Sequence, residues 1–596
     1  MVVIRQNPTT LVVRYVLTIM ELIPLLVHFL LAVISVCNNH IYTLNNNIEY
    51  TKMNKKISIL ALVLTLVVTS CSDFLETPSK SSLSTGNFYK TPAQMDQALT
   101  GVYSCLKPLS IYYFAMSEIR SDNMLQTTEA KANDYADCSQ FNSTSLLTNS
   151  IVANCWADYY KLIASANALL ENMGGLSETT EDVKTQYEAE ARFLRGFAYF
   201  DLVRFFGRVP LSTTVLSTAE SFALKQSESV EIYTQIIEDL EFATNNLQES
   251  SVDFQGKKHP ERVSAIAAKA LLGKVYMQMA GFPLYKDTKA QAEEMLREVL
   301  QEANALNGIP TKYWAKDIDE WNKMWIHENN NKYFLFEIQY ACEKDAGNPM
   351  TPLTRVQNSK ADNYCNANLT IGPHLYINRD LQDEFFQLNA DVEGGEVTDI
   401  LDERLSGTIN TASFYDEETG EYVGGIKDAN NFMVKFFEHK MKRNELGFPD
   451  MDASIVDRTY WPQNFPLLRI EDVMLLYAEC VGNTNEGYHC LNLIRTRAGM
   501  STLTGLSPQQ FQVAVLSERR HELLGEGQRW FDQVRLNTFV DDIKTKFINY
   551  RDLRDGSHSA NYTVYANRVT PDMYLYPIPL SQIQVHQGLY TQNKGY

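Results

Sequence analysis

Residues 187–210, YEAEARFLRGFAYFDLVRFFGRVP, are the stretch of sequence around which the rest of the chain is organised. Apolar residues recur along it at helical spacing on one face, and phenylalanines form a second face beside the first. A helix that is apolar over most of its circumference is buried on several sides. Gly207 falls where a left-handed C-cap is expected, and Pro210 blocks continuation, so we expect a core helix that ends there. Its apolar positions are Ala191, Phe193, Leu194, Phe197, Ala198, Phe200, Leu202 and Phe205.

Four charged residues lie among these aromatic residues. Because a buried charge has to be paired, we expect them to tie the helix to its neighbours. We favour a structural network of ion pairs over a catalytic group, since such networks are common in buried helices. The four residues are Arg192, Arg195, Asp201 and Arg204.

The composition is that of a large folded protein. The chain has 596 residues, of which 45% are hydrophobic, so several domains and a sizeable core are within its reach. A net charge of −19 argues against nucleic acid as a partner, because binding phosphates requires a basic surface. The nine cysteines are scattered without a CxxC pair, which gives no support to a zinc site or a disulfide scaffold.

A secretory signal begins at Met53. Lys55 and Lys56 form its charged region, and residues 57–68 form its apolar region, so residues 53–70 are predicted to be a signal peptide. Small residues then precede Cys71, and residues 68–71 resemble the lipobox of bacterial lipoproteins. That resemblance implies that Cys71 is lipidated and becomes the mature N-terminus, which would hold the protein on a membrane. The alternative is an ordinary signal peptide that a cysteine follows by coincidence.

Residues 1–52 precede this signal and contain another apolar run at 11–36. Its length would allow a transmembrane helix. We favour instead a translation start at Met53, with residues 1–52 as an upstream extension. Residues 71–90, rich in Ser, Thr and Gly, are expected to form a lipidated tether before a domain over residues 91–596.

Helical periodicity dominates two parts of this domain, about residues 151–306 and 469–540. Helix pairs of this length joined by short loops resemble tetratricopeptide repeats, whose period is ~34 residues. We therefore predict an all-α fold: a tetratricopeptide-like helical-repeat frame with an irregular, loop-rich insert. The expected helices are 151–173, 187–206, 230–247, 263–280, 288–306, 469–481, 487–498, 508–524 and 528–536.

The insert covers about residues 307–468, where helical periodicity weakens. Alternation of apolar and polar residues predicts a strand at 332–340, and aromatic residues flanking a polar turn predict a hairpin at 414–423. Residues 121–149, which are rich in Asn, Asp, Ser and Thr, are expected to form a loop. Loops on a rigid frame often carry function, so we expect the ligand site in the insert.

No catalytic or metal-binding motif stands out. His521 and Glu522 begin the HExxH pattern of zinc proteases, but Gly525 occupies the position of the second histidine. Residues 450–454 resemble the start of a calcium loop, but Ile455 stands where glycine is required. A pair of catalytic carboxylates cannot be recognised from sequence, because glycoside hydrolases take the two groups from distant positions. We therefore expect no cofactor and no resident metal.

An aromatic cluster at the opening of the insert is the better candidate for a binding site. Flat aromatic faces stack on the C–H faces of sugars, while nearby polar groups bind hydroxyls. The equally weighted alternative is that these rings pack an otherwise thin insert. Trp156 and Trp530 lie on strongly periodic helices and are expected in the core. The cluster consists of Tyr313, Trp314, Trp321 and Trp325.

Motifs spread in order along residues 71–596 resemble the SusD/RagB family of outer-membrane nutrient-binding lipoproteins. The most specific match joins residues 190–196 to residues 206–210, and the others extend the resemblance over essentially the whole mature chain. The other matching stretches are 73–78, 98–104, 156–167, 469–479, 492–499, 518–532, 576–579 and 592–596.

The resemblance implies a cell-surface protein of the outer membrane that delivers a captured oligosaccharide, or in some members a peptide, to a SusC-like TonB-dependent transporter. The best-known starch-binding member uses an arc of aromatic residues, part of which would fall near Phe141 and Asn142. This chain has no tryptophan there, which argues against starch in particular.

Three hypotheses remain open at this point. The first is a non-enzymatic binding lipoprotein, which the full-length resemblance and the lack of a catalytic motif favour. The second is a surface glycoside hydrolase, which would need two carboxylates ~5–9.5 Å apart in an aromatic cleft. The third is a helical-repeat scaffold that binds no ligand and therefore has no concave aromatic pocket.

Overall fold

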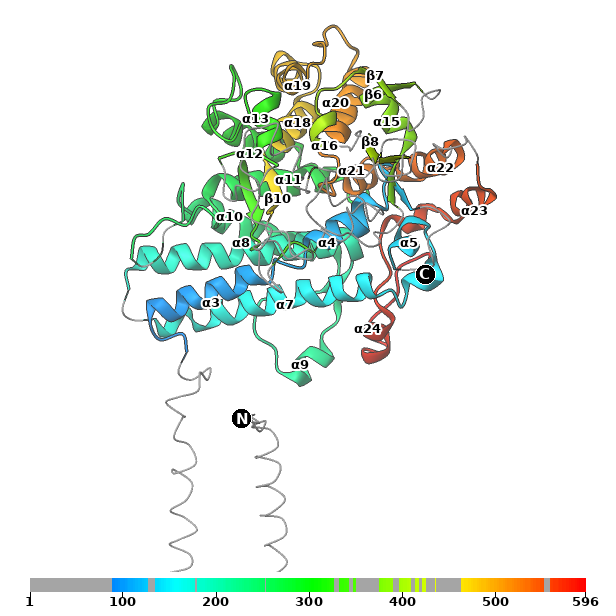
Figure 1. Cartoon of the computed structure of the whole chain (residues 1–596). Helices are drawn as coiled ribbons and strands as arrows, with labels where there is room; N and C mark the ends of the chain where they lie inside the picture. The colour runs from blue at the N-terminus through cyan, green and yellow to red at the C-terminus, as the bar shows by residue number, and fades with distance from the viewer. Residues whose placement is uncertain are drawn as a thin grey trace, which may run out of the picture. The chain divides into compact units, whose positions relative to one another are not determined.

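Helices make up most of the described residues in the computed structural model (Figure 1). Within the described ranges, none of these helices combines the length and the apolarity that crossing a bilayer requires. The signal peptide, Cys71, the tether up to residue 87 and residues 450–454 lie outside the described residues. The structure describes residues 88–126, 134–176, 179–251, 253, 255–325, 332–341, 347–349, 375–389, 396–408, 413–416, 421–424, 435, 463–550 and 558–596.

Successive helices of the main body pack against each other, as in helical-repeat folds. Helix α7 packs on α8, α8 on α10, α10 on α11, α11 on α12, α12 on α18, and α18 on α19. The predicted all-α fold class is confirmed, and we call helices α7–α12 with α18–α21 the helical frame. Its main members are α7 (Ser150–Asn172), α8 (Glu181–Phe206), α10 (Ser229–Asn246), α11 (Ala265–Ala280), α12 (Lys289–Glu302), α18 (Ile470–Val481), α19 (Asn485–Arg497), α20 (Pro508–Glu522) and α21 (Arg529–Arg535).

Helix α8 is the predicted core helix. The Thr180 side chain caps its first turn by accepting a hydrogen bond from the Val183 amide. Gly207 ends it at φ +71°, where its amide donates to the Val203 carbonyl at 2.9 Å. A Cβ at Gly207 would lie 2.6 Å from Leu575 Cδ1, so both the backbone angle and the space require glycine. The eight apolar residues named for this helix are all buried.

The charged residues of α8 are paired, as predicted. Arg195 holds Asp239 of α10 through two hydrogen bonds of 2.7 and 2.8 Å, which ties α8 to its neighbour. Arg204 pairs with Asp201, one turn away on the same helix. Arg192 pairs with Glu188 near the surface at 2.7 Å. The pairing with Asp239 thus joins α8 to α10, whereas the other two pairs lie within α8 itself.

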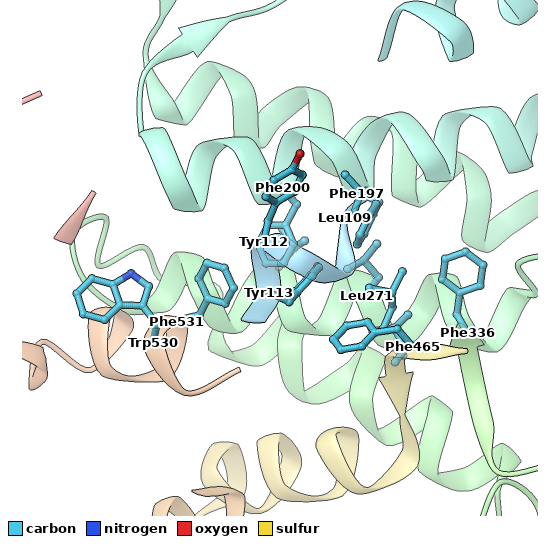
Figure 2. Packing of buried hydrophobic residues seen from close by; sticks show 14 of the residues in the cluster. Leu109, Tyr112, Tyr113, Phe197, Phe200, Leu271, Phe336, Phe465, Trp530 and Phe531 are labelled. Carbon is cyan, nitrogen blue, oxygen red and sulfur yellow. The ribbon is translucent and has the colours of Figure 1, made fainter. Parts of the chain in front are cut away.

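A second core region forms where the N-terminal and C-terminal parts of the described chain meet. Tyr113 in the π-helix η1 (Tyr113–Glu118) lies among aromatic residues of the frame, and Figure 2 shows its ring near those of Phe465 and Phe531. Arg120 donates to the Met573 carbonyl at 2.9 Å, and the Tyr576 hydroxyl donates to the Met116 carbonyl at 3.0 Å. The first and last parts of the described chain thus share one core.

The core prediction for two tryptophans is also confirmed. Trp156 on α7 is 4% exposed, and Trp530 on α21 is 1% exposed. Trp156 packs edge-on against Phe206 at the end of α8, with 5.2 Å between the ring centres. Both rings therefore serve the packing of the frame.

Most of the described antiparallel strand pairs involve the insert, while β2 (Val209–Pro210) and β3 (Gln226–Ser227) pair with each other in the frame. Strand β4 (Phe334–Ile338), predicted within 332–340, pairs with β10 (Phe465–Arg469). The predicted hairpin is confirmed as β8 (Ser413–Asp416) and β9 (Glu421–Gly424). The remaining insert elements are α13 (Ile318–Lys323), β5 (Leu375–Ile377), α15 (Arg379–Phe385), β6 (Phe386–Asn389), β7 (Glu396–Ile400) and α16 (Leu405–Thr408).

One expectation from the sequence is wrong. Residues 121–149 are not a loop, because their described part contains β1 (Met124–Gln126), α5 (Asp134–Ser139) and α6 (Ser143–Leu146). The Asn149 side chain at the end of this stretch caps α7. The helix expected at 469–481 is confirmed as α18, with Arg469 as its N-cap residue at the end of the buried strand β10.

Candidate functional site

The aromatic cluster at the opening of the insert lies mostly inside the protein. Trp321, on α13, has no exposed surface, and Trp325 and Trp314 are 2% and 6% exposed. Tyr313 is half-buried and sits in a left-handed backbone conformation with φ +58°. The rings of Trp321 and Trp325 meet edge to face, with 5.7 Å between their centres.

Cationic side chains cover the faces of these tryptophans. The Lys435 ammonium nitrogen lies 4.6 Å from the centre of the Trp325 ring and 5.6 Å from that of Trp321. The Arg497 guanidinium carbon lies 4.2 Å from the centre of the Trp314 ring. Cations attract aromatic faces, so these contacts stabilise the buried rings and occupy surfaces on which a sugar would otherwise stack.

A buried ionic network lies beside the tryptophans and joins the insert to the frame. Glu522 of α20 is its centre, and it accepts hydrogen bonds from Arg404 of the insert, Arg469 and Arg497 at 2.8–3.0 Å. The Trp321 indole nitrogen donates to the same carboxylate at 2.9 Å. We call this network the junction cluster; it consists of Asp402, Arg404, Lys435, Arg469, Glu471, Arg497, Glu518, His521, Glu522 and Glu526.

Lys435, a residue of the insert, binds the end of α20 and the residues that follow it. Its ammonium group donates to the carbonyls of Glu522 and Leu524 at 2.7 and 3.1 Å, and to the Glu526 carboxylate at 2.6 Å. Burial lowers the pKa of this lysine, and the attraction of Glu526 counteracts the shift only in part. The side chain that fixes the insert is thus a completely buried cation with three partners.

The electrostatics of the junction cluster are those of a structural network. Burial by itself would raise the pKa of Glu522, but the adjacent guanidinium groups outweigh it and hold that pKa well below its usual range. Burial by itself would lower the pKa of His521. The hydrogen bonds of this histidine to Asp402 and Glu384 outweigh burial, so that its pKa is raised. A carboxylate held ionised in this way cannot donate a proton as a general acid.

Metal ligation finds no support in the part of the chain that the structure describes, where no group of three or more suitable side chains comes together. His521 illustrates the reason. Its two ring nitrogens lie 3.1 Å from Asp402 and 2.7 Å from Glu384, so both carboxylates serve as hydrogen-bond partners of one histidine.

The structure places Phe141 and Asn142 in a different cluster from the four insert residues. Phe141 is completely buried, and the Arg120 guanidinium carbon lies 4.2 Å from its ring centre. Asn142 is half-buried and donates to the Asp137 carboxylate at 3.2 Å. The six residues predicted to contact a ligand are therefore not brought together as one surface.

Of the two interpretations given to the insert aromatics, the observed contacts favour a packing role for the three tryptophans. Tyr313 is the one ring of the four with substantial exposure. Ligand contact by any of the six residues stays a prediction. The junction cluster was missed at the sequence level, although residues 518–532, which supply four of its members, were singled out as a stretch that resembles the family.

Comparison with known families finds two matches that together span most of the chain. The profile of the SusD family matches residues 354–596. A second profile, described as starch-binding associating with outer membrane, matches residues 73–277. The two matches thus include α7 to α10 and most of α11 before the insert, the insert from residue 354 onward, and all of the frame helices after it.

Similar proteins match over nearly their whole length. A SusD-like protein P25 of Formosa agariphila is 24% identical over 571 residues, covering 88% of this chain and 97% of that protein. The crystal structure of a SusD homologue from Bacteroides thetaiotaomicron superposes with a TM-score of 0.69 at 22% identity, covering 86% of this chain and 99% of that one. A protein described as a laminarin-binding SusD-like protein gives a TM-score of 0.60 at 23% identity, covering 85% and 100%.

Proposed function

The chain belongs to the SusD/RagB family, and on that premise we propose that it is a cell-surface lipoprotein that captures a nutrient, namely an oligosaccharide. The observation that carries the proposal is the likeness over the full length, in fold and in sequence motifs, to proteins named for this family. One protein with the same fold is described as binding laminarin, which supports a glycan as the ligand class. The protein is a binder and not an enzyme.

Delivery to a transporter is the second part of the proposal. The captured ligand would pass to a SusC-like TonB-dependent transporter in the outer membrane, and lipidation of Cys71 would keep the protein at the cell surface. A family profile described as associating with the outer membrane supports this location. A lipid anchor contributes ~0.8 kcal/mol per buried methylene, which makes a multiply acylated Cys71 a lasting attachment.

We place the ligand on the insert, with Tyr313 as a direct contact. Its ring is partly open, and burial of the rest of the side chain raises the pKa of its hydroxyl, which therefore stays a neutral hydrogen-bond donor. The three buried tryptophans would not contact the ligand, but their packing would stabilise the insert around Tyr313. Removing Tyr313 should therefore weaken binding without affecting the fold, whereas removing a tryptophan should affect both.

The test is calorimetry of residues 72–596 against a panel of neutral and acidic oligosaccharides and of peptides. Each binder is titrated again with Tyr313→Ala and with Trp321→Ala, and the melting temperature of each variant is recorded. Tyr89→Ala is the matched control, because Tyr89 is also half-buried with a positive φ of 66° but lies outside the insert. Binding that Tyr313→Ala weakens about tenfold or more, with an unchanged melting temperature, would support both the function and the site.

Each other outcome has a clear meaning. Release of shortened products during the titration would favour the hydrolase hypothesis. Absence of binding to the whole panel would favour the scaffold hypothesis. Binding that both variants leave unchanged would keep the proposed function and rule out the insert surface around Tyr313.

A further inference from the structure

A cavity of about 590 Å³ lies in the frame, away from the insert. It is bounded by the C-terminal ends of α8 and α11, the start of α10, and the segment after Pro571. This volume is within the ~300–1,000 Å³ that is typical of small-molecule sites. The cavity shares no lining residue with the junction cluster or with the insert aromatics, and nothing in the proposed function uses it.

Two buried polar side chains line this cavity with unused hydrogen-bonding capacity. Gln278 of α11 is 8% exposed and Tyr233 of α10 is 4% exposed. Neither side chain makes a hydrogen bond to another described residue, and neither contributes to the fully enclosed polar atoms that lack a partner in that part of the chain. Water in the cavity can therefore hydrate both groups, and the hydroxyl groups of a ligand can replace that water. Burial also raises the pKa of Tyr233, so its hydroxyl remains a neutral donor and acceptor.

Another part of the lining is aromatic and apolar. Phe282 and Tyr574 meet edge to face, with 4.9 Å between their ring centres, and Leu284 and Leu575 also line the cavity. A lining that combines apolar side chains with a few polar groups suits a ligand that has both an apolar face and hydroxyl groups.

The charges of the lining are balanced. Arg208 lies 3.6 Å from Glu228 at the rim and also donates to the Thr591 hydroxyl at 2.6 Å. Asp572 and Lys594 add one charge of each sign. Deeper in the cavity, Arg204 is already paired with Asp201. A site without excess charge favours a neutral ligand over a uronate or a phosphate.

We propose that this frame cavity is a second binding site, for one or two rings of a neutral saccharide, with Gln278 and Tyr233 as its hydrogen-bonding residues. The proposal rests on the cavity and its lining, and it does not require the insert to bind the nutrient. A frame site would let the protein hold a short saccharide independently of the ligand on the insert.

The experiment titrates the full mature chain with D-glucose, D-galactose, maltose and laminaribiose, with glucuronate and a dipeptide as charged probes. Binding is measured by calorimetry and by saturation-transfer NMR. The variants are Tyr233→Phe, Gln278→Leu and the two combined. Tyr276→Phe and Gln301→Leu are matched controls, since Tyr276 lies on α11 outside the cavity lining and Gln301 is exposed on α12.

The expected result is that a neutral saccharide binds and that the double variant weakens it about tenfold or more, as expected for the loss of two hydrogen bonds. The single controls and Tyr313→Ala should leave this binding unchanged. Loss with Tyr313→Ala alone would assign the binding to the insert and overturn the cavity proposal. Binding of none of the neutral probes, binding of the charged probes only, or binding that the double variant does not affect would overturn it as well.

Discussion

The pairing of α8 with α10 and the junction between insert and frame are both completely buried, but they are built from different interactions. Between α8 and α10, apolar side chains fill the interface, and one carboxylate, Asp239, receives Arg195 at 2.7 Å and the more exposed Arg192 at 3.8 Å. At the junction, Glu522 alone receives three arginines. The first interface forms from a periodic sequence pattern, whereas the second depends on charges that lie far apart in the chain.

This difference matters for how each interface would fail. Apolar packing loses free energy in proportion to the volume removed, so damage stays local. A buried ionic network fails when one partner is removed, because the remaining charges are left without compensation. The junction should therefore be the more sensitive of the two interfaces to a single conservative substitution.

The largest effect is expected for Glu522→Gln. The substitution keeps the size of the side chain but leaves Arg404, Arg469 and Arg497 short of a buried countercharge, so the free energy of unfolding should fall by ~3–5 kcal/mol. Chemical denaturation of the variant and the wild type at pH 7 measures the difference. A loss below about 1 kcal/mol would mean that the junction behaves like a surface network, and the contrast between the two interfaces would disappear.

A somewhat smaller loss is expected for Leu240→Ala in the α8–α10 interface. Leu240 is completely buried against Gly196, where an added Cβ would lie 3.3 Å from Leu240 Cγ. Truncating a buried leucine costs ~2–5 kcal/mol, depending on how far the neighbours close the cavity. Denaturation is again the measurement, and Val230→Ala on the exposed side of α10 is the control, expected to change stability by no more than ~0.5 kcal/mol.

A pH dependence of the free energy of unfolding should come from Lys546 on α22 (Phe539–Asn549), which is a buried lysine like Lys435. Burial lowers its pKa from 10.5 to about 7, while its ammonium group donates to the Ser121 carbonyl at 2.5 Å. Between these two pKa values the folded state binds fewer protons than the unfolded state, so this residue makes stability rise with pH. The rise should be ~1.4 kcal/mol per pH unit from pH 7 to 9.

Lys546→Met should remove this slope. The measurement compares the unfolding free energies of wild type and variant at pH 6, 7, 8 and 9. Their difference should be constant below pH 7 and should shift in favour of the wild type above it. If the unfolding free energies of wild type and variant ran parallel over the whole pH range, the pKa of Lys546 would be the same in the folded and unfolded states. Burial of this lysine would then have no effect on the pH dependence of stability.

The smallest effect is expected for the surface pair Lys269–Glu298, which joins α11 to α12 at 2.9 Å. Its two side chains are 25% and 40% exposed, so water screens their attraction. Lys269→Met should change stability by ~0.2–1 kcal/mol in the same denaturation assay. A loss approaching that of Glu522→Gln would show that burial does not separate the two kinds of ion pair in this protein.

The sequence supports prediction of the frame because its pattern is local. The helix expected at 263–280 is α11 (Ala265–Ala280), and Gly207 ends α8 where the left-handed cap was expected. Periodicity, caps and glycines act within a few residues of each other, so a single sequence reveals them.

The junction and the cavity could not be predicted in the same way. Arg404 and Glu522 are 118 residues apart, and no local pattern pairs them. Gln278 is one polar residue in the helix expected at 263–280, and only the fold shows that it lines a cavity. The insert tryptophans illustrate the same limit, since an aromatic cluster has the same sequence whether it packs inward or faces a ligand.

The contacts of η1 with the C-terminal part of the chain have a consequence for the order of folding. The hydrogen bond from the Tyr576 hydroxyl to the Met116 carbonyl joins residues 460 positions apart, and that from Ser117 to the Gly527 carbonyl joins residues 410 positions apart. Contacts between such distant residues are slow to form, because a long loop has to close before they stabilise anything. While the chain is being synthesised, these contacts of η1 cannot form until nearly all the later helices have been made. Until then η1 has only its nearer partners, such as Asp201, to which the Tyr113 hydroxyl donates at 2.6 Å.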